Sequence, residues 1–401
     1  CQLPHSATRC LRNRGRYIGE FVFVSQDTAH RLRRSALRLG DIFLPHRGAI
    51  GEVGIISDRA PTSSVMSTSL MRLRVDPAKA DADFVFWYLK SPDGRHEILL
   101  YASTVGTPGI GQPLTWLRAM RVPLPPLDEQ RSIARLLNTL DDKIEVNRRM
   151  AATLEEMARA LYRSWFVDFD PVTARAQGRA PAHMDPATAA LFPARLTDAG
   201  LPEGWEIGTL GDIARNRRDQ VQPSAIDPET PYVGLEHMPR RSIAIGDWGV
   251  AGDVGSAKSR VAEGSFLFGK LRPYFHKVGL APVAGICSTD ILVVEPVEAV
   301  WSGLVLSVIS SDAFVEHANA TSSGTRMPRA NWGDMARYEI VVPDRKVARA
   351  FRNLVAPMHA RIVQSIHENR TLAALRDALL PKLMSGELRV REAEAQVGEV
   401  A

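Results

Sequence analysis

The chain has 401 residues, of which 45% are hydrophobic and 24% charged, so it can bury several hydrophobic cores and is not a disordered polymer. Its three cysteines (Cys1, Cys10 and Cys287) are too few and too scattered for a disulfide framework or a metal site, and its longest apolar runs are only strand-sized, which excludes disulfide-rich secreted and membrane-spanning proteins. The net charge of +5 permits a polyanionic partner, and we expect a cytoplasmic protein with no membrane partner.

Residues 1–121 predict a mixed α/β domain with antiparallel sheet. Short β-runs broken by glycine and proline come first, as FVFV, DIFLP, GEVGII and SLMRLRV. A helix follows around DFVFWYLKS, then a polar loop, STVGTPGIGQP, and a last strand in RVPLPP. Matching Gly40 to Gly264 suggests that about 20 residues are absent from the front of this domain relative to the second one described below.

Residues 122–169 predict one long helix from Asp128 to Phe166, with Asp128 as its N-cap. The apolar positions form a heptad seam, which predicts packing along another helix as a coiled coil. The alternative is an ordinary amphipathic helix that packs on a globular core. The predicted helix is, however, about three times as long as an average helix in a globular protein. The seam consists of Ile133, Leu137, Leu140, Ile144, Asn147, Leu154 and Leu161.

The segment 170–201 is rich in alanine and proline, which predicts a surface linker. Residues 202–340 predict a second mixed α/β domain, with strands in PYVGL, GSFLFGKL, VGLAP, DILVVEP and YEIVVP and a helix around SGLVLSVISS. Residues 341–391 predict another long helix, with seam positions Ile362, Leu372 and Leu379. Pro357 predicts a break or kink, so the long part should run from Met358 to about Leu380 and end at Pro381 and Gly386.

The two halves of the chain repeat one another. Residues 122–161 align without a gap on residues 340–379, with eight of 40 positions identical and apolar partners at most seam positions. The register continues upstream through Gly106 and Gly324. The chain is therefore predicted to contain two copies of one unit, each a sheet-rich domain followed by a long helix.

No catalytic or metal-binding constellation is evident in the sequence. GDVGSAKS at Gly252 lacks the glycine before Lys258 that a phosphate-binding loop needs, and no apolar strand precedes it. His276 and His317 have no partners at metal-ligand spacing. We therefore expect no enzyme activity, no cofactor and no metal.

Basic and polar side chains gather in loops that suit nucleic-acid recognition. Residues 1–121 hold 17 Lys and Arg against 10 Asp and Glu, whereas residues 202–339 hold 13 against 17, so the second domain is acidic overall. Its basic side chains are nonetheless grouped in GKLRPYFHK and SSGTRMPRAN. Such loops carry the donors that contact phosphates and base edges, although ordinary solvated surface charge remains the alternative for any one residue.

Several motifs along the chain make the sequence similar to the specificity subunit of a type I restriction-modification enzyme. The resemblance rests on LPEGWEIGTLGDIA, GSFLFGKLRPYFHKVG with ICSTDILVV, PLPPLDEQRSIARLL, ALYRSWFVDFDP and LLPKLMSGEL, in that family's order of parts. It implies two target-recognition domains, each reading one half of a split DNA sequence, and two conserved helices, packed antiparallel, that set the spacer. It also implies a non-catalytic chain whose partners are double-stranded DNA, two methylation subunits docked on the helices, and restriction subunits joined through the complex.

The loops give a set of candidate DNA-contacting residues. In the first domain they are His46, Arg47, Thr104 and Thr107, and in the second they are Lys270, Arg272, Tyr274, His276, Lys277, Ser323, Thr325, Arg326, Arg329 and Asn331. Two other functions stay open. An interaction scaffold would show the same paired helices without binding DNA, and a nuclease or methylase would show activity in this chain alone.

Overall fold

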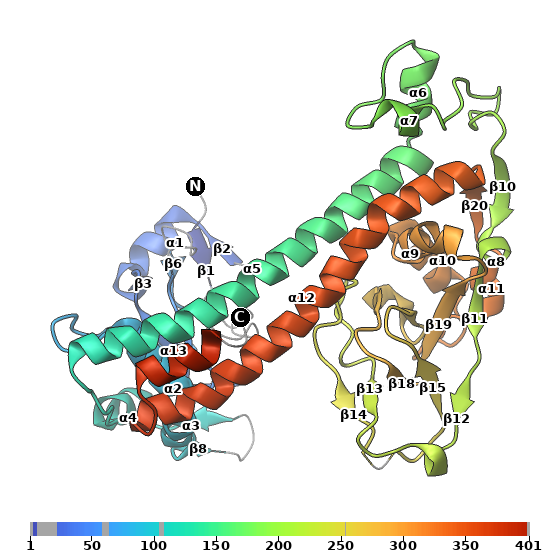
Figure 1. Cartoon of the computed structure of the whole chain (residues 1–401). Coiled ribbons are helices and arrows are strands. Elements are labelled where there is room, and N and C mark those ends of the chain that lie inside the picture. Colours follow the sequence, from blue (N-terminus) through green and yellow to red (C-terminus); the bar gives the residue numbers. More distant parts are fainter. Residues whose placement is uncertain (1–2, 6–21, 58–63, 104–107, 253, 399–401) are drawn as a thin grey trace. The chain divides into compact units, whose positions relative to one another are not determined.

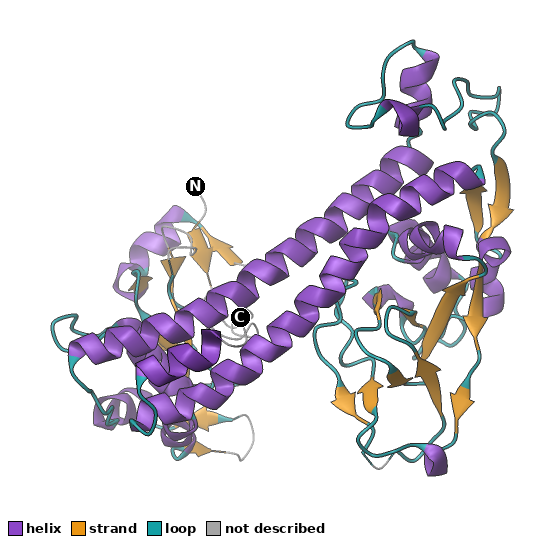
Figure 2. Cartoon of the chain, in the orientation of Figure 1, coloured by secondary structure: helices purple, strands orange, loops and turns teal. Residues whose placement is uncertain are grey.

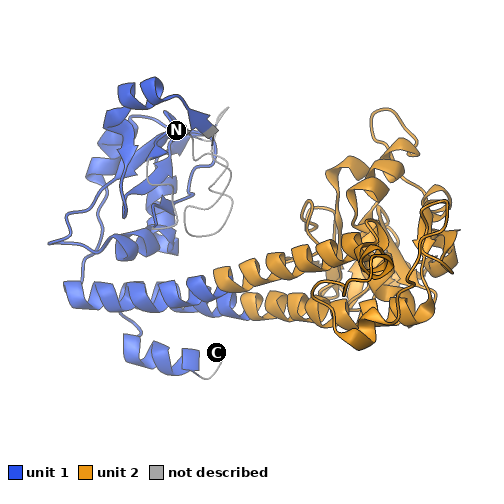
Figure 3. Ribbon diagram, turned by 90° about the horizontal axis from the view of Figure 1, so that it is seen from above, with its two compact units in different colours: residues 1–144, 371–401 blue, residues 145–370 orange. Residues whose placement is uncertain are grey.

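The structure is a computed structural model of the chain, and it describes all residues except 1–2, 6–21, 58–63, 104–107, 253 and 399–401. The chain divides into two compact units, unit 1 with residues 1–144 and 371–401 and unit 2 with residues 145–370 (Figures 1 and 3). Both units combine helices with small sheets (Figure 2). The predicted mixed α/β fold is confirmed.

The described residues of unit 1 form three small sheets. Their orders are β2-β1-β6-β3, with β1 and β6 parallel, then β5-β4-β7 and β8-β9, both antiparallel. The strands are β1 (Leu3–His5), β2 (Val22–Val24), β3 (Ala36–Leu37), β4 (Ile42–Pro45), β5 (Gly54–Ile55), β6 (Ser64–Val65), β7 (Leu70–Leu73), β8 (Ala102–Ser103) and β9 (Gly109–Ile110). The predicted β-runs of this domain are thus present up to Leu73.

The helices of unit 1 cover the central strand β4, which is buried along its whole length. In α2, six consecutive residues from Phe84 to Leu89 are buried, because this helix lies inside the core. The helices that begin in unit 1 are α1 (Gln26–Arg31), α2 (Ala82–Lys90), α3 (Pro92–Leu99), α4 (Pro113–Ala119), α5 (Leu127–Phe166) and α13 (Val390–Gly398). The end of α12 (Arg345–Ser385) also belongs to this unit.

Unit 2 also contains three sheets. The pair β10-β20 and the sheet β11-β19-β16-β17 are antiparallel, and the sheet β12-β15-β18-β13-β14 has one parallel pair, β13 with β18. The strands are β10 (Glu206–Thr209), β11 (Ala214–Arg217), β12 (Gln220–Val221), β13 (Pro231–Val233), β14 (Gly249–Val250), β15 (Lys258–Val261), β16 (Phe266–Gly269), β17 (Val278–Leu280), β18 (Gly285–Cys287), β19 (Ile291–Pro296) and β20 (Glu339–Val342). Every strand predicted for the second domain is present.

The helices of unit 2 pack on the antiparallel sheet that contains β16 and β19. The helix α9 is buried from Gly303 to Ile309, and its side chains join those of β16 and β19 in one core. Besides the adjoining parts of α5 and α12, the helices are α6 (Asp170–Ala176), α7 (Pro186–Ala189), α8 (Leu210–Ile213), α9 (Ser302–Ile309), α10 (Asp312–Ala320) and α11 (Trp332–Ala336).

The two units share one internal plan, as the sequence repeat predicted. The sheet β5-β4-β7 of unit 1 corresponds to β17-β16-β19 of unit 2, and each central strand follows a glycine with positive φ, 80° at Gly40 and 77° at Gly264. A pair of helices comes next, α2 with α3 and α9 with α10. A serine caps the second helix of each pair, Ser91 through the amide of Gly94 and Ser311 through that of Phe314. The duplication therefore extends to the order of the elements.

In unit 1, the beginning of α5 packs on the end of α12. The seam residues Ile133, Leu137, Leu140 and Ile144 are at most 2% exposed. They share a core with Leu372 and Leu379 of α12, which are 6% and 2% exposed. Between the helices, Arg376 Nη1 donates to Asp141 Oδ1 over 2.7 Å.

In unit 2, the end of α5 packs on the beginning of α12, so the helices run antiparallel in each unit. The predicted polar seam residue Asn147 is 1% exposed, and its Nδ2 donates to Glu368 Oε2 over 2.9 Å. Ile362 is fully buried, whereas Leu154 and Leu161 are partly buried against the same core. At the far end, the ring centroids of Phe166 and Phe351 lie 4.9 Å apart.

The second long helix neither breaks at Pro357 nor ends at Pro381, although the sequence had predicted both. The helix α12 continues through Pro357 and Pro381 to Ser385, and Gly386 with a φ of 77° follows it. A proline removes one backbone donor from a helix and costs about 3 kcal/mol. Burial of Val355 and Ile362 on either side of Pro357 opposes that cost, because both side chains are 0% exposed in the core of unit 2.

Two predictions at the start of α5 also need correction. The helix begins at Leu127, so Asp128 lies in its first turn and is not its N-cap. The stretch RVPLPP forms no strand, since residues 120–126 have no regular structure. Pro123, Pro125 and Pro126 carry no amide proton, so they cannot donate to a sheet ladder.

The segment 170–201, predicted as a surface linker, is mostly exposed but anchors several side chains in the core of unit 2. Val172 in α6 is 0% exposed, and Phe192 is 1% exposed. The ring of Phe192 meets that of Trp165 edge-on at 4.9 Å between centroids, and it also contacts Trp205. Alanine and proline are frequent here because the segment is built from two short helices that each begin at a proline or directly before one.

Candidate nucleic-acid interface

Two loops of unit 2 that the sequence predicted to face DNA lie against one another. The first loop follows β16, and the second precedes α11. Ala330 N donates to Lys270 O over 2.9 Å, and Arg272 N donates to Pro328 O over 2.7 Å. Leu271 and Arg329 are also paired as an isolated β-bridge. Residues almost 60 positions apart in the sequence thus form one surface.

Unit 1 holds the same pairing of loops. Ile110 N donates to His46 O over 3.0 Å, and Gly48 N donates to Pro108 O over 2.9 Å. The imidazole of His46 lies 2.9 Å from Thr68 O through Nε2, whereas Arg47 is exposed. The predicted contacts Thr104 and Thr107 lie outside the described residues. Each unit therefore presents a basic loop directly after its central strand, β4 or β16. A second loop lies beside it, before β9 in unit 1 and before α11 in unit 2.

A polar groove of about 530 Å³ opens beside the paired loops of unit 2. Lys270 and Asn331 contribute to it from the two loops, and Thr289 contributes from the turn before β19. The other wall comes from β11 and the residues that follow it. The polar lining residues are Asn216, Arg217, Arg218, Gln220, Ser259, Lys270, Thr289 and Asn331.

The wall that β11 provides was not among the residues predicted from the sequence. Asn216, Arg217, Arg218 and Gln220 all line the groove, and all fall in the run ARNRRDQ. Three arginines within four residues were the signal that could have identified it. The run was overlooked because it lies more than 50 residues before the GKLRPYFHK loop, and only the antiparallel pairing of β11 with β19 brings the two together.

The cations of the groove and of the loop before α11 differ in whether a carboxylate already binds them. Arg217 donates to Asp219 Oδ2 over 2.9 Å and to Glu295 Oε1 over 3.0 Å, and the hydrogen bond to Asp219 raises its pKa. Arg329 is held by Asp290 at 3.2 Å. By contrast, within the part of the chain that the structure describes, no carboxylate lies within ion-pair distance of Lys270, Arg218 or Arg326. These three cations are available to a phosphate.

Most of the remaining predicted contacts in unit 2 are on the surface. Tyr274 is 52% exposed. Ser323, Thr325 and Arg326 are exposed in the loop before α11. Asn331 is exposed but also caps α11 by accepting the amide of Asp334. Arg272 is half-buried with a positive φ of 52°, and its Nε has no hydrogen-bond partner among the described residues.

Two predicted DNA contacts face the protein instead. His276 is 6% exposed, its Nε2 lies 2.9 Å from Ser310 O, and burial lowers its pKa. Lys277 is half-buried and donates to Leu235 O, and burial lowers its pKa as well. The spacing of basic residues in GKLRPYFHK could not show that the chain turns inward after Phe275. We therefore remove His276 and Lys277 from the candidate interface.

A larger cavity in unit 2, of about 760 Å³, lies between the sheet and α12. Its walls are mainly apolar, with Phe266, Leu280, Val355 and Val363 among them. Burial lowers the pKa of His359, which lines it, to about 4, so this imidazole is neutral at physiological pH. A mainly apolar cavity whose charged lining residues include the carboxylates Glu263 and Glu295 does not suit a polyanion.

The described residues contain no group of three or more His, Cys, Asp or Glu side chains placed to hold a metal ion. In the same part of the chain, no single helix has the length and apolar character needed to cross a membrane. The segments Ala299–Ile309 and Asp312–Ala320 meet that criterion only together, and they are bent by 71°.

Comparison with known proteins gives consistent matches. The family described as "Type I restriction modification DNA specificity domain" matches residues 28–156. The chain is 24% identical over 390 residues to the type I restriction enzyme MjaIX specificity subunit of Methanocaldococcus jannaschii, covering 93% of this chain and 85% of that protein. It is 22% identical over 409 residues to the HindI specificity subunit of Haemophilus influenzae, covering 88% of each.

Solved structures match over most of the chain as well. The S subunit of a type I restriction-modification system from M. genitalium is similar with a TM-score of 0.49 and 16% identity, over 86% of this chain and 83% of that one. The HsdS subunit from Thermoanaerobacter tengcongensis is similar with a TM-score of 0.31 and 16% identity, over 97% of this chain and 91% of that one.

Proposed function

We propose that this chain, which belongs to the family of type I restriction-modification specificity subunits, reads a bipartite double-stranded DNA target through the paired loops of its two units. It is a non-catalytic subunit that directs separate methylation and restriction subunits. The observation that carries the proposal is the pairing of a basic loop with a second polar loop, which occurs in both units. Two copies of one reading surface suit a target with two halves.

The groove of unit 2 has the chemistry that DNA recognition needs. Lys270 and Arg218 of the groove, and Arg326 of the loop before α11, can bind phosphates, because no described carboxylate lies within ion-pair distance of them. Asn216 and Gln220 can donate to and accept from base edges, as amide side chains do with adenine in the major groove. Phosphate contacts supply affinity and amide contacts supply sequence preference, so the groove offers both.

The helix pair is proposed to set the spacer between the two half-sites. The helix α5 has 40 residues and so spans about 60 Å at 1.5 Å per residue. Its seam with α12 is buried within each unit, as the proposal requires. In this proposal, residues 1–121 and 202–340 are the recognition domains and residues 122–169 and 341–391 are the spacer helices.

An exposed apolar stripe on α5 supports docking of the methylation subunits. Val146 and Met157 are 53% and 47% exposed. Thr153 and Ala160 are exposed on the same face, since the spacing of these residues returns to one side of a helix. A charge-poor stripe of this kind is typical of a surface that a protein partner covers. We propose two methylation subunits, because the unit is duplicated, and restriction subunits that join through the assembled complex. We also propose that the subunit is cytoplasmic, where its DNA target would be.

Substitution of the free cations tests the DNA-binding role. Lys270→Ala and Arg326→Ala are each expected to weaken binding of the assembled complex to its target. A lost phosphate contact should also reduce the dependence of log Kd on log salt by about one unit. If Arg326 instead reads a guanine edge, its removal should cost about 1 to 3 kcal/mol at one base pair only. Equilibrium titrations at several salt concentrations distinguish the two.

Lys346→Ala is the matched control, because Lys346 is an exposed lysine of α12 in the same unit and its removal changes the net charge equally. It should leave binding unchanged. Target binding by the double variant Lys270→Ala/Arg326→Ala at wild-type strength and with the wild-type salt dependence would show that these loops do not face DNA.

A further inference from the structure

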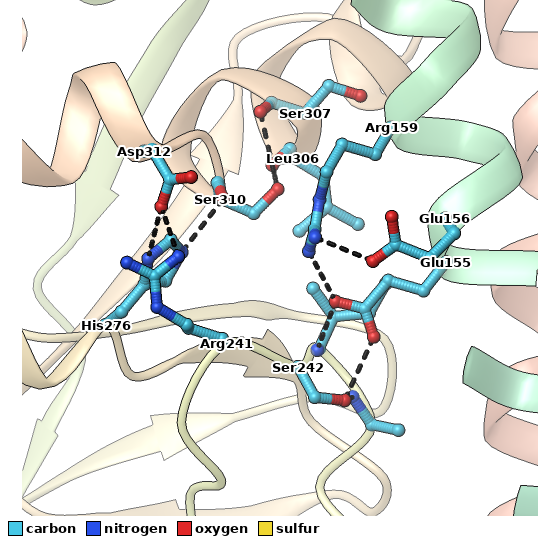
Figure 4. Close-up of polar contacts among 12 residues, drawn as sticks. Glu155, Glu156, Arg159, Arg241, Ser242, His276, Leu306, Ser307, Ser310 and Asp312 are labelled. Atoms are coloured by element: carbon cyan, nitrogen blue, oxygen red, sulfur yellow. Dashed lines mark hydrogen bonds and ion pairs between the residues drawn. The ribbon is translucent and has the colours of Figure 1, made fainter. Parts of the chain in front are cut away.

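A buried carboxylate on α5 holds a loop of unit 2. Glu155 is 7% exposed. Its Oε1 accepts from Ile243 N and from Arg159 Nη2, each over 3.0 Å, and its Oε2 accepts from Ser242 Oγ over 2.9 Å (Figure 4). A buried carboxylate is costly unless such donors compensate it. The segment at 242–243 is therefore fixed to the helix by the backbone itself as well as by a side chain.

The segment that Glu155 holds is bonded in turn to the chain that follows the recognition loop. Arg241 N donates to His276 O over 2.9 Å, and Leu280 N donates to Ile243 O over the same distance. Arg241 and His276 both have left-handed backbone, with φ of 56° and 50°. A displacement of the 241–243 segment would thus move the exit of the recognition loop, residues 270–277.

Side chains reinforce this junction. Arg241 Nη1 donates to Asp312 Oδ1 over 2.7 Å, and His276 Nδ1 lies 3.3 Å from the same oxygen (Figure 4). His276 Nε2 is 2.9 Å from Ser310 O, in the turn between α9 and α10. These contacts explain why His276 points inward: its imidazole connects the loop to the helices α9 and α10.

The entrance of the same loop carries the candidate interface. Arg272 N is bonded to Pro328 O, and Tyr274 is exposed between Arg272 and the buried His276. Next to it, the guanidinium of Arg240 stacks on the ring of Phe275 at 4.1 Å. The loop is therefore held at its exit by contacts that lead to α5 and at its entrance by the second loop of the groove.

We propose that Glu155 is a positioning residue that fixes the DNA-recognition loop 270–277 to α5. This inference rests on the proposed function and adds to it a physical link between the helix that carries the docking stripe and the loop that reads DNA. Met157 of the stripe is two residues from Glu155 on α5. A methylation subunit bound to the apolar stripe of α5 would contact the same helix turn from which Glu155 holds the loop 270–277.

The test compares Glu155→Ala with Glu156→Ala in the assembled complex. Glu156 is the matched control, since it neighbours Glu155, pairs with the same Arg159, and has a side chain that is 68% exposed. Glu155→Ala should speed amide exchange at residues 241–245 and 272–277. It should also lower discrimination against wrong bases about tenfold in the half-site that Arg326→Ala weakens, and leave the other half-site unchanged. Glu156→Ala should change neither.

Glu155→Gln covers the case in which the alanine variant fails to fold. A glutamine keeps one acceptor for Ile243 N but loses the charge that holds Arg159, so its effect should have the same pattern and be smaller. Unchanged discrimination at both half-sites, or an equal loss at both, overturns the positioning role of Glu155. If the wild-type complex binds no bipartite target, the proposed function is wrong, and the exchange measurement still decides whether Glu155 holds the loop.

Discussion

Replacement of Arg376 by alanine is expected to lower the free energy of unfolding by about 3 to 5 kcal/mol, because it leaves the carboxylate of Asp141 buried without its partner. Arg376 and Asp141 are 5% and 7% exposed, and their Nη1 and Oδ1 atoms are 2.7 Å apart. The guanidinium also lies over the ring of Trp87, 5.8 Å from its centroid. Burial and, after it, the Arg376 charge lower the pKa of Lys90, and that repulsion offsets a small part of the loss.

Two further variants show whether burial of the pair causes the effect. Arg131→Ala removes an exposed partner of Asp128 on α5, and a surface pair of this kind contributes about 0 to 1 kcal/mol. The double variant Asp141→Leu/Arg376→Met removes both charges and should restore stability or raise it, as apolar replacement of buried pairs often does. Urea unfolding of the full chain measures all three. A loss below about 1 kcal/mol in Arg376→Ala would mean that Asp141 reaches water, which contradicts the buried pair.

Lengthening both spacer helices is expected to lengthen the recognised DNA spacer. Asn147 bonds Glu368 across the helix pair, so four residues added after Arg148 and four after His367 extend the two helices at the same level. Four residues add about 6 Å, and coiled helices accept such an insertion with local unwinding. With about 3.4 Å per base pair, the spacer should grow by one or two base pairs while both half-sequences stay the same.

The control for this experiment is the same four residues inserted after Gly178. This exposed glycine has a φ of 68° and no neighbour within 4 Å of its Cβ position, so the insertion changes the chain length without touching the helices. Methylation mapping of both variants in the assembled complex gives the spacer directly. A spacer that stays unchanged after the helix insertion, with activity retained, would refute the helix pair as the ruler, as would tolerance of several spacer lengths.

The long-range pattern of the sequence was enough to predict the framework. The heptad seam from Ile133 to Ile144 identified α5 to within one residue, because burial on one face of a helix leaves a regular signal. Five strands of the second domain, β13, β16, β17, β19 and β20, were equally clear, since runs such as ILVV are buried on both faces of β19. Such features depend on residues close in sequence, and their chemistry is visible there.

Features that depend on tertiary contacts could not be predicted. Pro357 reads as a helix breaker, and only the core around Phe351 and Ile362 keeps α12 continuous. His276 reads as a free donor among basic residues, and only the position of Ser310 and Asp312 turns it inward. The pairing of loop 270–272 with loop 328–330 is also invisible in sequence, although it determines where the groove lies.

The central claim is that this chain supplies DNA specificity and no catalysis, and methylation mapping tests it most directly. Genomic DNA and S-adenosylmethionine are incubated in three reactions. The first contains the methylation subunits alone, the second contains this chain alone, and the third contains the methylation subunits together with this chain. The account predicts methylation only with both, at one target whose two specific halves are separated by a fixed spacer, and a changed preference in one half with Lys270→Ala/Arg326→Ala. Methylation by this chain alone, or methylation at the same sites whether or not the chain is present, would contradict it.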